Sequence, residues 1–287
     1  MAIRFWKLTG AGNDFIGIDN MSGTLESRNL STMIRHLCDR RFGIGSDGVL
    51  VLEQPQKKAA AHFRMRYFNA DGSEAATCGN GARCAARLAH HLDIAPADMN
   101  FETLAGLYHA TVTPDTVTVN LPSVGLPEKD IPVSSSVFDG MVDYNLVGVP
   151  HVTIYVDALE QIRVFDIGRS LRYHPRFEPP GINVNFIKVV DPHTIHIRTY
   201  ERGVENETLA CGTGSLASSI SMVSRGLGSP PVNVITRSGI TLSFDFSISA
   251  KGIDAIIMTG PADVVFAGQV DLEQLERITP PNPGNIR

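Results

Sequence analysis

The two halves of this 287-residue chain resemble each other, and this internal repeat constrains the fold more than any other sequence feature. Four short stretches of the first half recur in the second half in the same order. They are residues 8–13 against 146–151, 43–44 against 181–182, 66–69 against 198–201, and Cys78 against Cys211. The offset between matched residues varies only from 132 to 138, as expected when loops of slightly different length separate the same elements. We therefore predict two duplicated halves that pack about an approximate two-fold axis.

The hydrophobic pattern predicts a mixed α/β (α+β) chain. Apolar residues recur at helical spacing in three places, which are residues 30–37, residues 85–92 and residues 216–223, the last followed by the stop signal Arg225-Gly226. Short β-rich runs bounded by turn residues predict strands between them. These runs are residues 49–53, 62–68, 110–121, 152–156, 194–200 and 240–248, and residues 111–121 form a hairpin with Pro-Asp at its centre.

A segment rich in Pro, Ser and Gly, residues 121–140, is expected to join the halves. This places the first domain at residues 1–122, completed by 266–287, and the second domain at residues 123–265. A cleft between two such halves is the natural site for a ligand.

Composition excludes several classes of function. The formal net charge of −5 argues against nucleic acid or an anionic membrane as a partner. No uninterrupted apolar stretch of 18 residues and no N-terminal apolar region is present, so we expect a cytoplasmic protein. The four cysteines form no CxxC pair, so no metal site is predicted, and Cys38 and Cys84 are expected to be core residues.

Each half carries a cysteine followed by a glycine-flanked turn at the start of a predicted helix: Cys78 in CGNG and Cys211 in CGTG. A helix N-terminus favours the negative thiolate. Two such thiols suit inversion at a carbon that bears an acidic proton, because one removes the proton from one face while the other delivers a proton to the opposite face. The two groups exchange roles in the reverse reaction, which explains why both are cysteines.

The residues after each cysteine suit an anion. Gly79-Asn80 and Gly212-Thr213 are expected to present backbone N–H groups to a carboxylate, which stabilises negative charge on the adjacent carbon. This chemistry needs no pyridoxal phosphate or metal, and the sequence contains no motif for either. We therefore expect no cofactor.

The same stretches resemble a known family. FNADGSEAATCGNGAR (68–83), ERGVENETLACGTG (201–214) and KLTGAGNDF (7–15) closely resemble motifs of the diaminopimelate epimerases, and the resemblance runs from Phe5 to about Gly260. It implies a cofactor-independent two-base epimerase that interconverts LL- and meso-2,6-diaminopimelate in lysine and peptidoglycan-precursor synthesis. It also implies two halves, each a mixed, mostly antiparallel sheet wrapped round a central helix, and a homodimer.

The resemblance also assigns roles by position. It implies that Cys78 and Cys211 are the acid/base pair, and that His151 and Glu201 adjust the pKa values of these cysteines. The substrate contacts that it implies are Asn13, Asn69, Gly79, Asn80, Asn183, Glu201, Arg202, Gly212 and Thr213. Arg202 suits a distal carboxylate, which a guanidinium binds with two hydrogen bonds.

The chain departs from the family pattern at two positions: Val149 where the family often has Asn, and Gly48 where some members have Gln. Two alternatives stay open at this point. One is a racemase or epimerase of another amino acid, similar to proline racemases, although those usually carry CGH rather than CGN at the first motif. The other is a non-enzymatic thiol-redox or small-molecule-binding protein in which the two cysteines form a disulfide.

Overall fold

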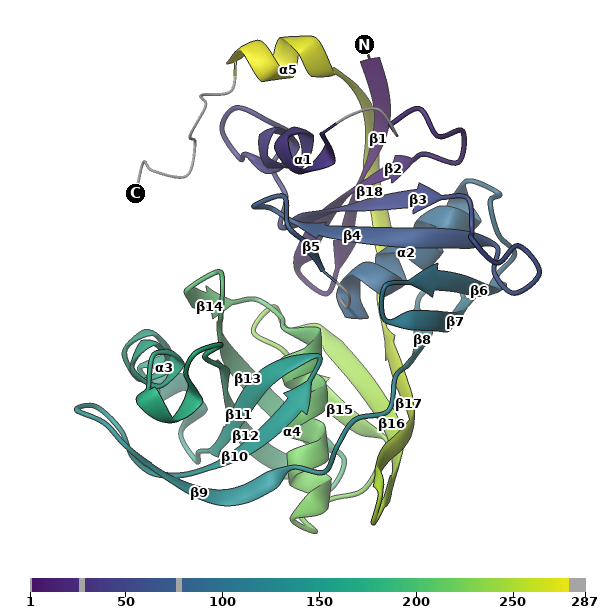
Figure 1. Ribbon diagram of the computed structural model, residues 1–287. Coiled ribbons are helices and arrows are strands. Elements are labelled where there is room, and N and C mark those ends of the chain that lie inside the picture. Colours follow the sequence, from purple (N-terminus) through teal and green to yellow (C-terminus); the bar gives the residue numbers. More distant parts are fainter. Residues whose placement is uncertain (1, 26–28, 76–78, 279–287) are drawn as a thin grey trace. The chain divides into compact units, whose positions relative to one another are not determined.

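The structure is a computed structural model that describes residues 2–25, 29–75 and 79–278 (Figure 1). Contacts between Cα atoms group the chain into two compact units. Unit 1 comprises the described residues of Met1–Val119 and Pro261–Arg287, and unit 2 comprises Asn120–Gly260. The domain boundaries expected from the sequence, after residues 122 and 265, stay a prediction.

Unit 1 contains most of the N-terminal elements together with the last strand and helix of the chain. Its elements are β1 (Ala2–Gly10), β2 (Asn13–Asp19), α1 (Leu30–Cys38), β3 (Gly48–Glu53), β4 (Phe63–Asn69), β5 (Glu74–Ala75), α2 (Gly79–His91), β6 (Asp98–Thr103), β7 (Gly106–Val112), β8 (Val117–Leu121, whose last two residues fall in unit 2), β18 (Asp263–Asp271) and α5 (Leu272–Ile278).

Unit 2 contains a second set of elements, which starts with β9 and then follows the order of unit 1 from β1 onward. They are β9 (Glu128–Ser134), β10 (Asp139–Val147), β11 (Val149–Tyr155), α3 (Val164–Arg172), β12 (Asn183–Asp191), β13 (Thr194–Glu201), β14 (Asn206–Thr208), α4 (Gly212–Ser224), β15 (Val232–Ile235), β16 (Thr241–Ser249) and β17 (Gly252–Gly260). Two short 3-10 turns, Leu159–Gln161 and Pro175–Phe177, flank α3.

Strand pairing repeats between the units. In unit 1 an antiparallel β1–β2 hairpin is followed by a parallel β2–β3 pair and an antiparallel β3–β4 pair, and β10 to β13 repeat these pairings in unit 2. The parallel pair β4–β6 and the antiparallel pair β6–β7 recur as β13–β15 and β15–β16. β18 pairs antiparallel with β1 as β9 does with β10. The predicted internal repeat is confirmed by this pairing.

A central helix organises each unit, as Figure 1 shows for α2 and α4. α2 contacts β1, β2, β3, β4, β7 and β18, whereas α4 contacts β10, β11, β12, β13, β15 and β16. Small side chains let the strands approach α2 closely: a Cβ added at Gly10 of β1 would lie 2.9 Å from the Cys84 sulfur. The predicted fold class, with strands wrapped round a central helix in each half, is confirmed.

The buried face of α4 is polar as well as apolar. Ser215, Ser218, Ser219 and Ser221 are all at most 1% exposed. Their hydroxyls have local partners in several cases: Ser219 donates to the Ser215 carbonyl at 2.9 Å, and Ser221 lies 3.0 Å from the Tyr155 hydroxyl. Hydroxyls with such partners can be buried at little cost. These partners allow serines as well as apolar residues of α4 to face the surrounding strands.

The three predicted helices and the predicted hairpin are confirmed by α1, α2, α4 and the β7–β8 pair. The segment of residues 121–140 also contains a strand that the sequence analysis did not predict, because β9 lies within it and pairs with β10. Ile131 and Val133 alternate with exposed neighbours and join the core of unit 2. The high content of Pro and Ser obscured this alternation of buried and exposed residues, which is the sequence signal of a strand. Among the described residues, no helix combines the length and apolar character needed to span a membrane.

Candidate active site

Cys211 lies at the N-terminus of the central helix of unit 2. It is the N-cap residue of α4, with an extended backbone (φ −123°, ψ 109°), and it is 6% exposed. The first turn of α4 contains no acidic residue, so no carboxylate of that turn neutralises the positive end of the helix dipole. Gly212 and Thr213 are the first two residues of the helix, and the Thr213 hydroxyl lies 3.6 Å from the Cys211 sulfur. This end of α4 favours an anion or a thiolate.

Asn185 packs directly under the first turn of α4. An added Cβ at Gly214 would lie 2.4 Å from the Asn185 Oδ1 atom and 3.3 Å from the Cys211 sulfur. Asn185 is fully buried, and its amide nitrogen donates to the Val152 carbonyl at 3.0 Å. Its Oδ1 atom accepts a hydrogen bond of 2.9 Å from the Thr199 hydroxyl. Gly214 therefore lets the helix start sit against a buried, hydrogen-bonded amide.

His151 lies on β11, opposite Asn183 of the parallel neighbour β12. It is fully buried, and burial together with the positive charge of Arg202 lowers the pKa of His151 to about 3. The imidazole is therefore neutral near pH 7. Its Nδ1 atom lies 3.4 Å from the amide nitrogen of Asn185, whereas its Nε2 atom has no hydrogen-bond partner among the described residues.

Asn183 links strand β12 to the turn after β13. Its Oδ1 atom accepts a hydrogen bond of 2.7 Å from the Arg202 backbone N–H, while the Arg202 guanidinium donates to the Pro180 carbonyl at 3.0 Å. Glu201, the last residue of β13, accepts a hydrogen bond of 2.8 Å from the Thr208 hydroxyl of β14. The structure thus connects four of the predicted site residues of unit 2: His151, Asn183, Glu201 and Arg202.

The turn that carries Glu201 and Arg202 has its own support. Glu205 adopts a positive φ of 56° in this turn, and its carboxylate accepts hydrogen bonds from the Gly203 backbone N–H at 3.0 Å and the Tyr200 hydroxyl at 3.2 Å. Arg172 of α3 adds an ion pair at 3.1 Å. Three separate donors therefore converge on one carboxylate, which fixes the turn against β13 and α3.

Unit 1 presents a matching helix start. The described part of α2 begins at Gly79, and Asn80 is 1% exposed. The Asn80 amide donates to Asn13 Oδ1 at 2.7 Å, and its own Oδ1 atom accepts from the buried Arg83 guanidinium at 3.0 Å. Asn13 in turn donates to Asp47 at 2.9 Å. Cys78 lies outside the described residues.

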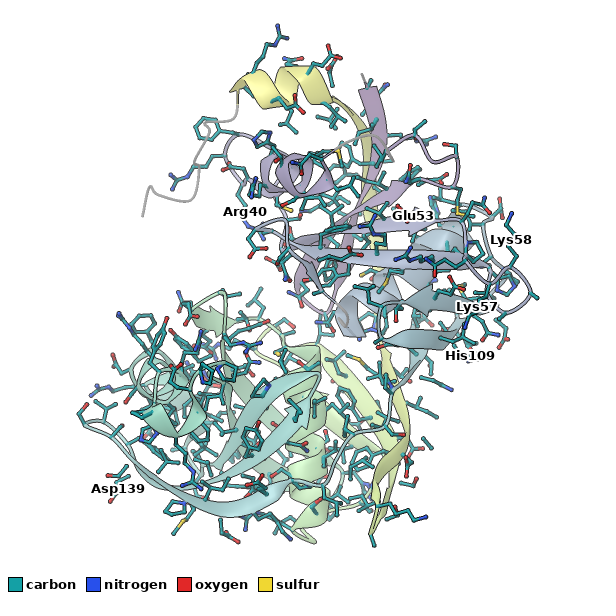
Figure 2. All side chains as sticks on the ribbon, viewed as in Figure 1. Arg40, Glu53, Lys57, Lys58, His109 and Asp139 are labelled. Carbon is teal, nitrogen blue, oxygen red and sulfur yellow. The ribbon has the colours of Figure 1, made fainter. Side chains whose placement is uncertain are left out.

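The loop beneath Asn13 is held by charged groups. Asp14 accepts from Lys7 and from Arg40, whose guanidinium (labelled in Figure 2) also pairs with Asp47 at 2.7 Å. Burial alone would raise the pKa of Asp14, but the hydrogen bonds and charges of Arg40 and Lys7 outweigh it and hold the pKa at about 2. The carboxylate is therefore ionised throughout the physiological range.

Asn69 does not share a described hydrogen bond with Asn13 or Asn80. Its Oδ1 atom accepts from the Tyr67 hydroxyl at 2.9 Å, and its amide donates to Ser73 at 3.0 Å. In the β3–β4 pair it lies opposite Gly48, the residue after Asp47. Asn69 and the Asn13–Asp47 pair thus approach the same end of β3.

The residues of these networks that sequence reasoning did not single out include Asp47, Arg83 and Asn185. A signal for Asn185 was present, because it is two residues after Asn183 and alternate residues of a strand share one face. Among the described residues, no group of three or more His, Cys, Asp or Glu side chains is arranged to hold a metal ion.

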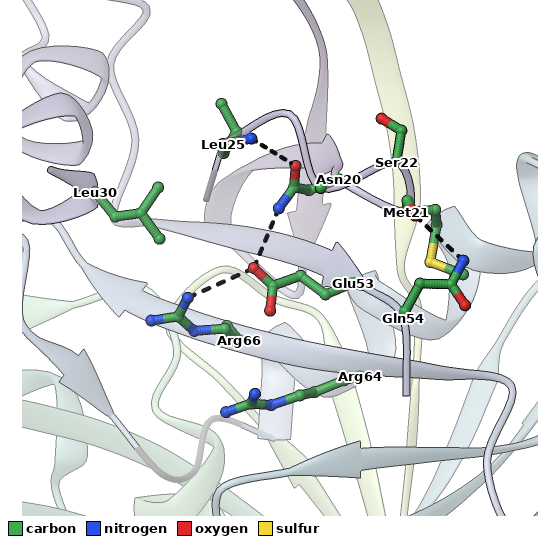
Figure 3. Close-up of a pocket in the computed structure, with 10 residues that line it drawn as sticks. Asn20, Met21, Ser22, Leu25, Leu30, Glu53, Gln54, Arg64 and Arg66 are labelled. Atoms are coloured by element: carbon green, nitrogen blue, oxygen red, sulfur yellow. Dashed lines mark hydrogen bonds and ion pairs between the residues drawn. The ribbon is translucent and has the colours of Figure 1, made fainter. Parts of the chain in front are cut away.

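A separate pocket of about 460 Å³ lies elsewhere in unit 1 (Figure 3). Glu53 at its centre accepts from Asn20 at 3.2 Å and from Arg66 at 3.5 Å, and Arg64 extends along the same wall. None of the described site residues predicted from the sequence lines this pocket. The predicted residues that the structure describes lie instead at the starts of α2 and α4, on strands that contact these helices, or in the turn after β13.

Comparison with known proteins identifies the family of this chain. The sequence profile of the diaminopimelate epimerase family matches residues 5–125 and 144–265. A diaminopimelate epimerase from Aquifex aeolicus (strain VF5) is 42% identical over 284 residues, which cover 96% of this chain and all of that protein. One from Archaeoglobus fulgidus is 39% identical and covers 96% of this chain and 99% of the relative. The chain belongs to the diaminopimelate epimerase family.

Solved structures share the fold of this family member at low sequence identity. A probable proline racemase from Agrobacterium radiobacter K84 superposes with a TM-score of 0.72 at 16% identity, covering 94% of this chain and 93% of that chain. A methylitaconate-delta-isomerase superposes with a TM-score of 0.60 at 11% identity, covering 96% and 97% of the two chains. These likenesses show a common fold.

The structure explains one of the two departures from the pattern of diaminopimelate epimerases. A Cβ at Gly48 would lie 2.5 Å from the Phe68 carbonyl and 2.7 Å from the Tyr67 ring. Such contacts leave no room for a side chain with this arrangement of β4. Val149 is the first residue of β11 and lies opposite Val147 across the hairpin. Nothing in the structure explains why Val occupies that position.

Proposed function

We propose that this protein interconverts LL- and meso-2,6-diaminopimelate by cofactor-independent two-base epimerisation, with Cys78 and Cys211 as the acid/base pair. The main support for this proposal is the family membership, because diaminopimelate epimerases are 34–42% identical to this protein over nearly the whole chain. The placement of Cys211 as the N-cap of the buried helix α4 supports the chemistry.

The proposed step is a balanced proton exchange. The thiolate of one cysteine removes the α-proton and becomes a thiol, which leaves an electron pair on the α-carbon. The thiol of the other cysteine donates its proton to the opposite face of that carbon and becomes a thiolate. No oxidation occurs, and the reverse reaction exchanges the two roles. The mechanism requires the two sulfurs to flank the α-carbon at reacting distance.

Both helix starts supply groups that suit the reacting carboxylate. We propose that Gly79, Asn80, Gly212 and Thr213 bind it, because backbone N–H groups at a helix N-terminus stabilise the charge that develops on the adjacent carbon. Asn80 and Thr213 add side-chain groups beside these N–H groups.

The remaining contacts suit the distal amino-acid end of the substrate. We propose Asn13, Asn69, Asn183, Glu201 and Arg202 as its partners. The Arg202 guanidinium has the donor geometry for a carboxylate, and Glu201 has the charge for an ammonium group. Asn13 and Asn183 are already oriented by Asp47 and by the Arg202 backbone, so binding would cost less ordering.

His151 and Glu201 are proposed to influence the cysteine pKa values. Because His151 is buried and neutral, its influence would come from hydrogen bonding rather than from a positive charge. Glu201 would act as a negative charge, which disfavours a nearby thiolate.

The test is solvent proton exchange. Reduced wild-type protein incubated with LL-diaminopimelate in D₂O should form the meso isomer with deuterium at the inverted α-carbon. Cys78→Ala and Cys211→Ala should each abolish this inversion, and Cys38→Ala, at a buried cysteine of unit 1 outside the proposed site, is the control that should retain it. Absence of both inversion and exchange in folded wild-type protein would refute the proposal.

The same assay separates the alternatives. Faster inversion of proline or another amino acid than of diaminopimelate would favour a racemase of different specificity. A protein that inverts no substrate but forms a reversible Cys78–Cys211 disulfide would be a thiol-redox protein.

We also propose a cytoplasmic homodimer. Support for self-association comes from Val265 and Phe266 of β18, which are 59% and 50% exposed. Exposed apolar side chains on a strand favour burial against a partner. Sedimentation velocity should give a dimer for wild-type protein and a monomer for Phe266→Glu. A wild-type monomer at micromolar concentration would contradict this assembly.

A further inference from the structure

The buried amide of Asn185 contacts three different groups. It lies in β12 between β11 and β13, and none of its side chain is exposed. Its nitrogen donates to the Val152 carbonyl at 3.0 Å and lies 3.4 Å from His151 Nδ1, while its oxygen accepts from Thr199 at 2.9 Å. The amide therefore touches the strand on each side of β12.

These partners determine which way the amide faces. A backbone carbonyl can only accept a hydrogen bond, so the group that faces Val152 must be the NH₂ group. Rotation by 180° would set Oδ1 against that carbonyl oxygen and bury two acceptors in contact. The Thr199 hydroxyl can donate to Oδ1 in the observed orientation. One orientation of Asn185 satisfies both neighbours.

The second hydrogen of this NH₂ group then faces His151. An imidazole nitrogen accepts a hydrogen bond only when it carries no proton. We infer that Asn185 is a positioning residue that holds His151 in the neutral tautomer protonated on Nε2, with Nδ1 as the acceptor. The functional consequence of this tautomer rests on the function proposed above for His151.

The surroundings of His151 agree with an uncharged ring. The ring is fully buried, and the charged group that acts on it is the cation Arg202, which disfavours a second positive charge. Nε2–H is then a buried donor for which the described residues supply no acceptor. A buried donor without a partner is costly unless a ligand completes it. Nε2–H is therefore the donor through which His151 would act in the role proposed above.

Asn185 also connects the imidazole to the catalytic helix. Its oxygen lies against Gly214, where an added Cβ would be 2.4 Å away. The same amide thus contacts the strand that carries His151 and the first turn of the helix that begins after Cys211. A shift of Asn185 would move both groups together.

Histidine tautomers can be measured directly without activity. In protein labelled with ¹⁵N-histidine, long-range ¹H–¹⁵N correlation spectra separate the two tautomers and the charged form by nitrogen shifts and cross-peak pattern. The signal lost in His151→Gln assigns the residue among the nine histidines. We expect an Nε2–H pattern for His151 that does not change between pH 8 and pH 5.5. An Nδ1–H pattern, or a charged ring at pH 6, would overturn the inference.

Two variants test the role of Asn185. Asn185→Asp replaces the donor with an acceptor, so we expect protonation to move to Nδ1, whereas an unchanged Nε2–H pattern would contradict the inference. Thr199→Val is the matched control, because it removes only the hydrogen bond to Oδ1 of the same amide and should leave the tautomer unchanged. If Asn185→Asp does not fold, the wild-type spectrum still shows which nitrogen of His151 carries the proton.

A kinetic readout then links the tautomer to the reaction. Asn185→Ala should lower kcat for diaminopimelate inversion by about tenfold to a hundredfold, with a smaller change in KM, because a misplaced group near the reacting centre impairs the chemical step. An unchanged kcat would show that this tautomer does not matter for turnover. If the wild-type protein inverts no diaminopimelate, the spectra still test the tautomer, so the two failures can be told apart.

Discussion

Replacing Gly214 by alanine should destabilise the protein, although the same change usually stabilises a helix. An added Cβ would lie 2.4 Å from Asn185 Oδ1, whereas real Cβ atoms essentially never approach closer than 3.0 Å. Asn185 must then move by about half an ångström or more. It is anchored to the Val152 carbonyl at 3.0 Å and to Thr199 at 2.9 Å, so this movement weakens buried hydrogen bonds.

The magnitude follows from two opposing effects. Gly→Ala inside a helix stabilises by about 1 kcal/mol through backbone entropy and helix propensity. Weakening two buried hydrogen bonds costs about 1 kcal/mol each, and overpacking a rigid core adds about 1 kcal/mol. We therefore expect a net loss of about 2 kcal/mol in the free energy of unfolding.

Urea denaturation at pH 7 measures this loss as a lower midpoint at constant slope. The control is the same substitution in an Asn185→Ala background, where the amide is gone and Gly214→Ala should become neutral or stabilising. Double-mutant coupling of this kind isolates the contact between the two residues. A Gly214→Ala protein as stable as wild type, or more stable, would refute the close packing of Asn185 under α4.

Three further predictions follow from the charged and buried groups. Because the folded pKa of His151, about 3, lies below its ordinary value of 6.5, the unfolded chain binds a proton that the folded chain does not. Stability from this group is complete above pH 6.5 and falls toward pH 3 by up to about 1.4 kcal/mol per pH unit. His151→Gln should flatten this decline in urea titrations at several pH values, and an unchanged decline would contradict a buried neutral ring. For Asp14 the folded pKa of about 2 lies below the ordinary 3.8, so its stabilisation is present above pH 4 and disappears as pH falls through 2. Asp14→Asn should therefore cost about 2 kcal/mol at pH 7 and almost nothing near pH 2, and a pH-independent difference would contradict the ion-pair origin. Asp47→Ala releases Asn13 from its 2.9 Å hydrogen bond, so KM for diaminopimelate should rise severalfold with a stability loss below about 1 kcal/mol, while Asp115→Ala on the exposed hairpin turn should leave KM unchanged.

The sequence alone predicted the elements whose signals are local or repeated. The apolar stripe of residues 30–37 gave α1, and the two CGxG motifs marked the starts of α2 and α4. The internal repeat predicted two similar units because it needs only the order of residues along the chain. β9 was missed because Pro and Ser obscured the alternation of Ile131 and Val133.

Site residues, too, could be named from the sequence only where a local pattern marks them. Cys211, Asn13 and Asn80 could be named from motifs, because the motif fixes residue type and spacing, whereas Asn183 was named only by its position in the family resemblance. Asn185 carries no such motif, and its importance depends on His151, which is 34 residues away in the sequence but one strand away in the sheet. Strand register, which no local pattern encodes, decides such contacts.

The sequence by itself therefore determined the duplication, the central helices and the pairing of one cysteine motif with each. Tertiary structure decided how the groups around them behave: the neutral state of buried His151, the lack of space at Gly48 and Gly214, and the ionised state of Asp14 between Lys7 and Arg40. The physical reason is that helical period and motif spacing are properties of neighbours along the chain. Charge state and packing depend instead on dehydration and on contacts between distant residues, which exist only after the strands have paired.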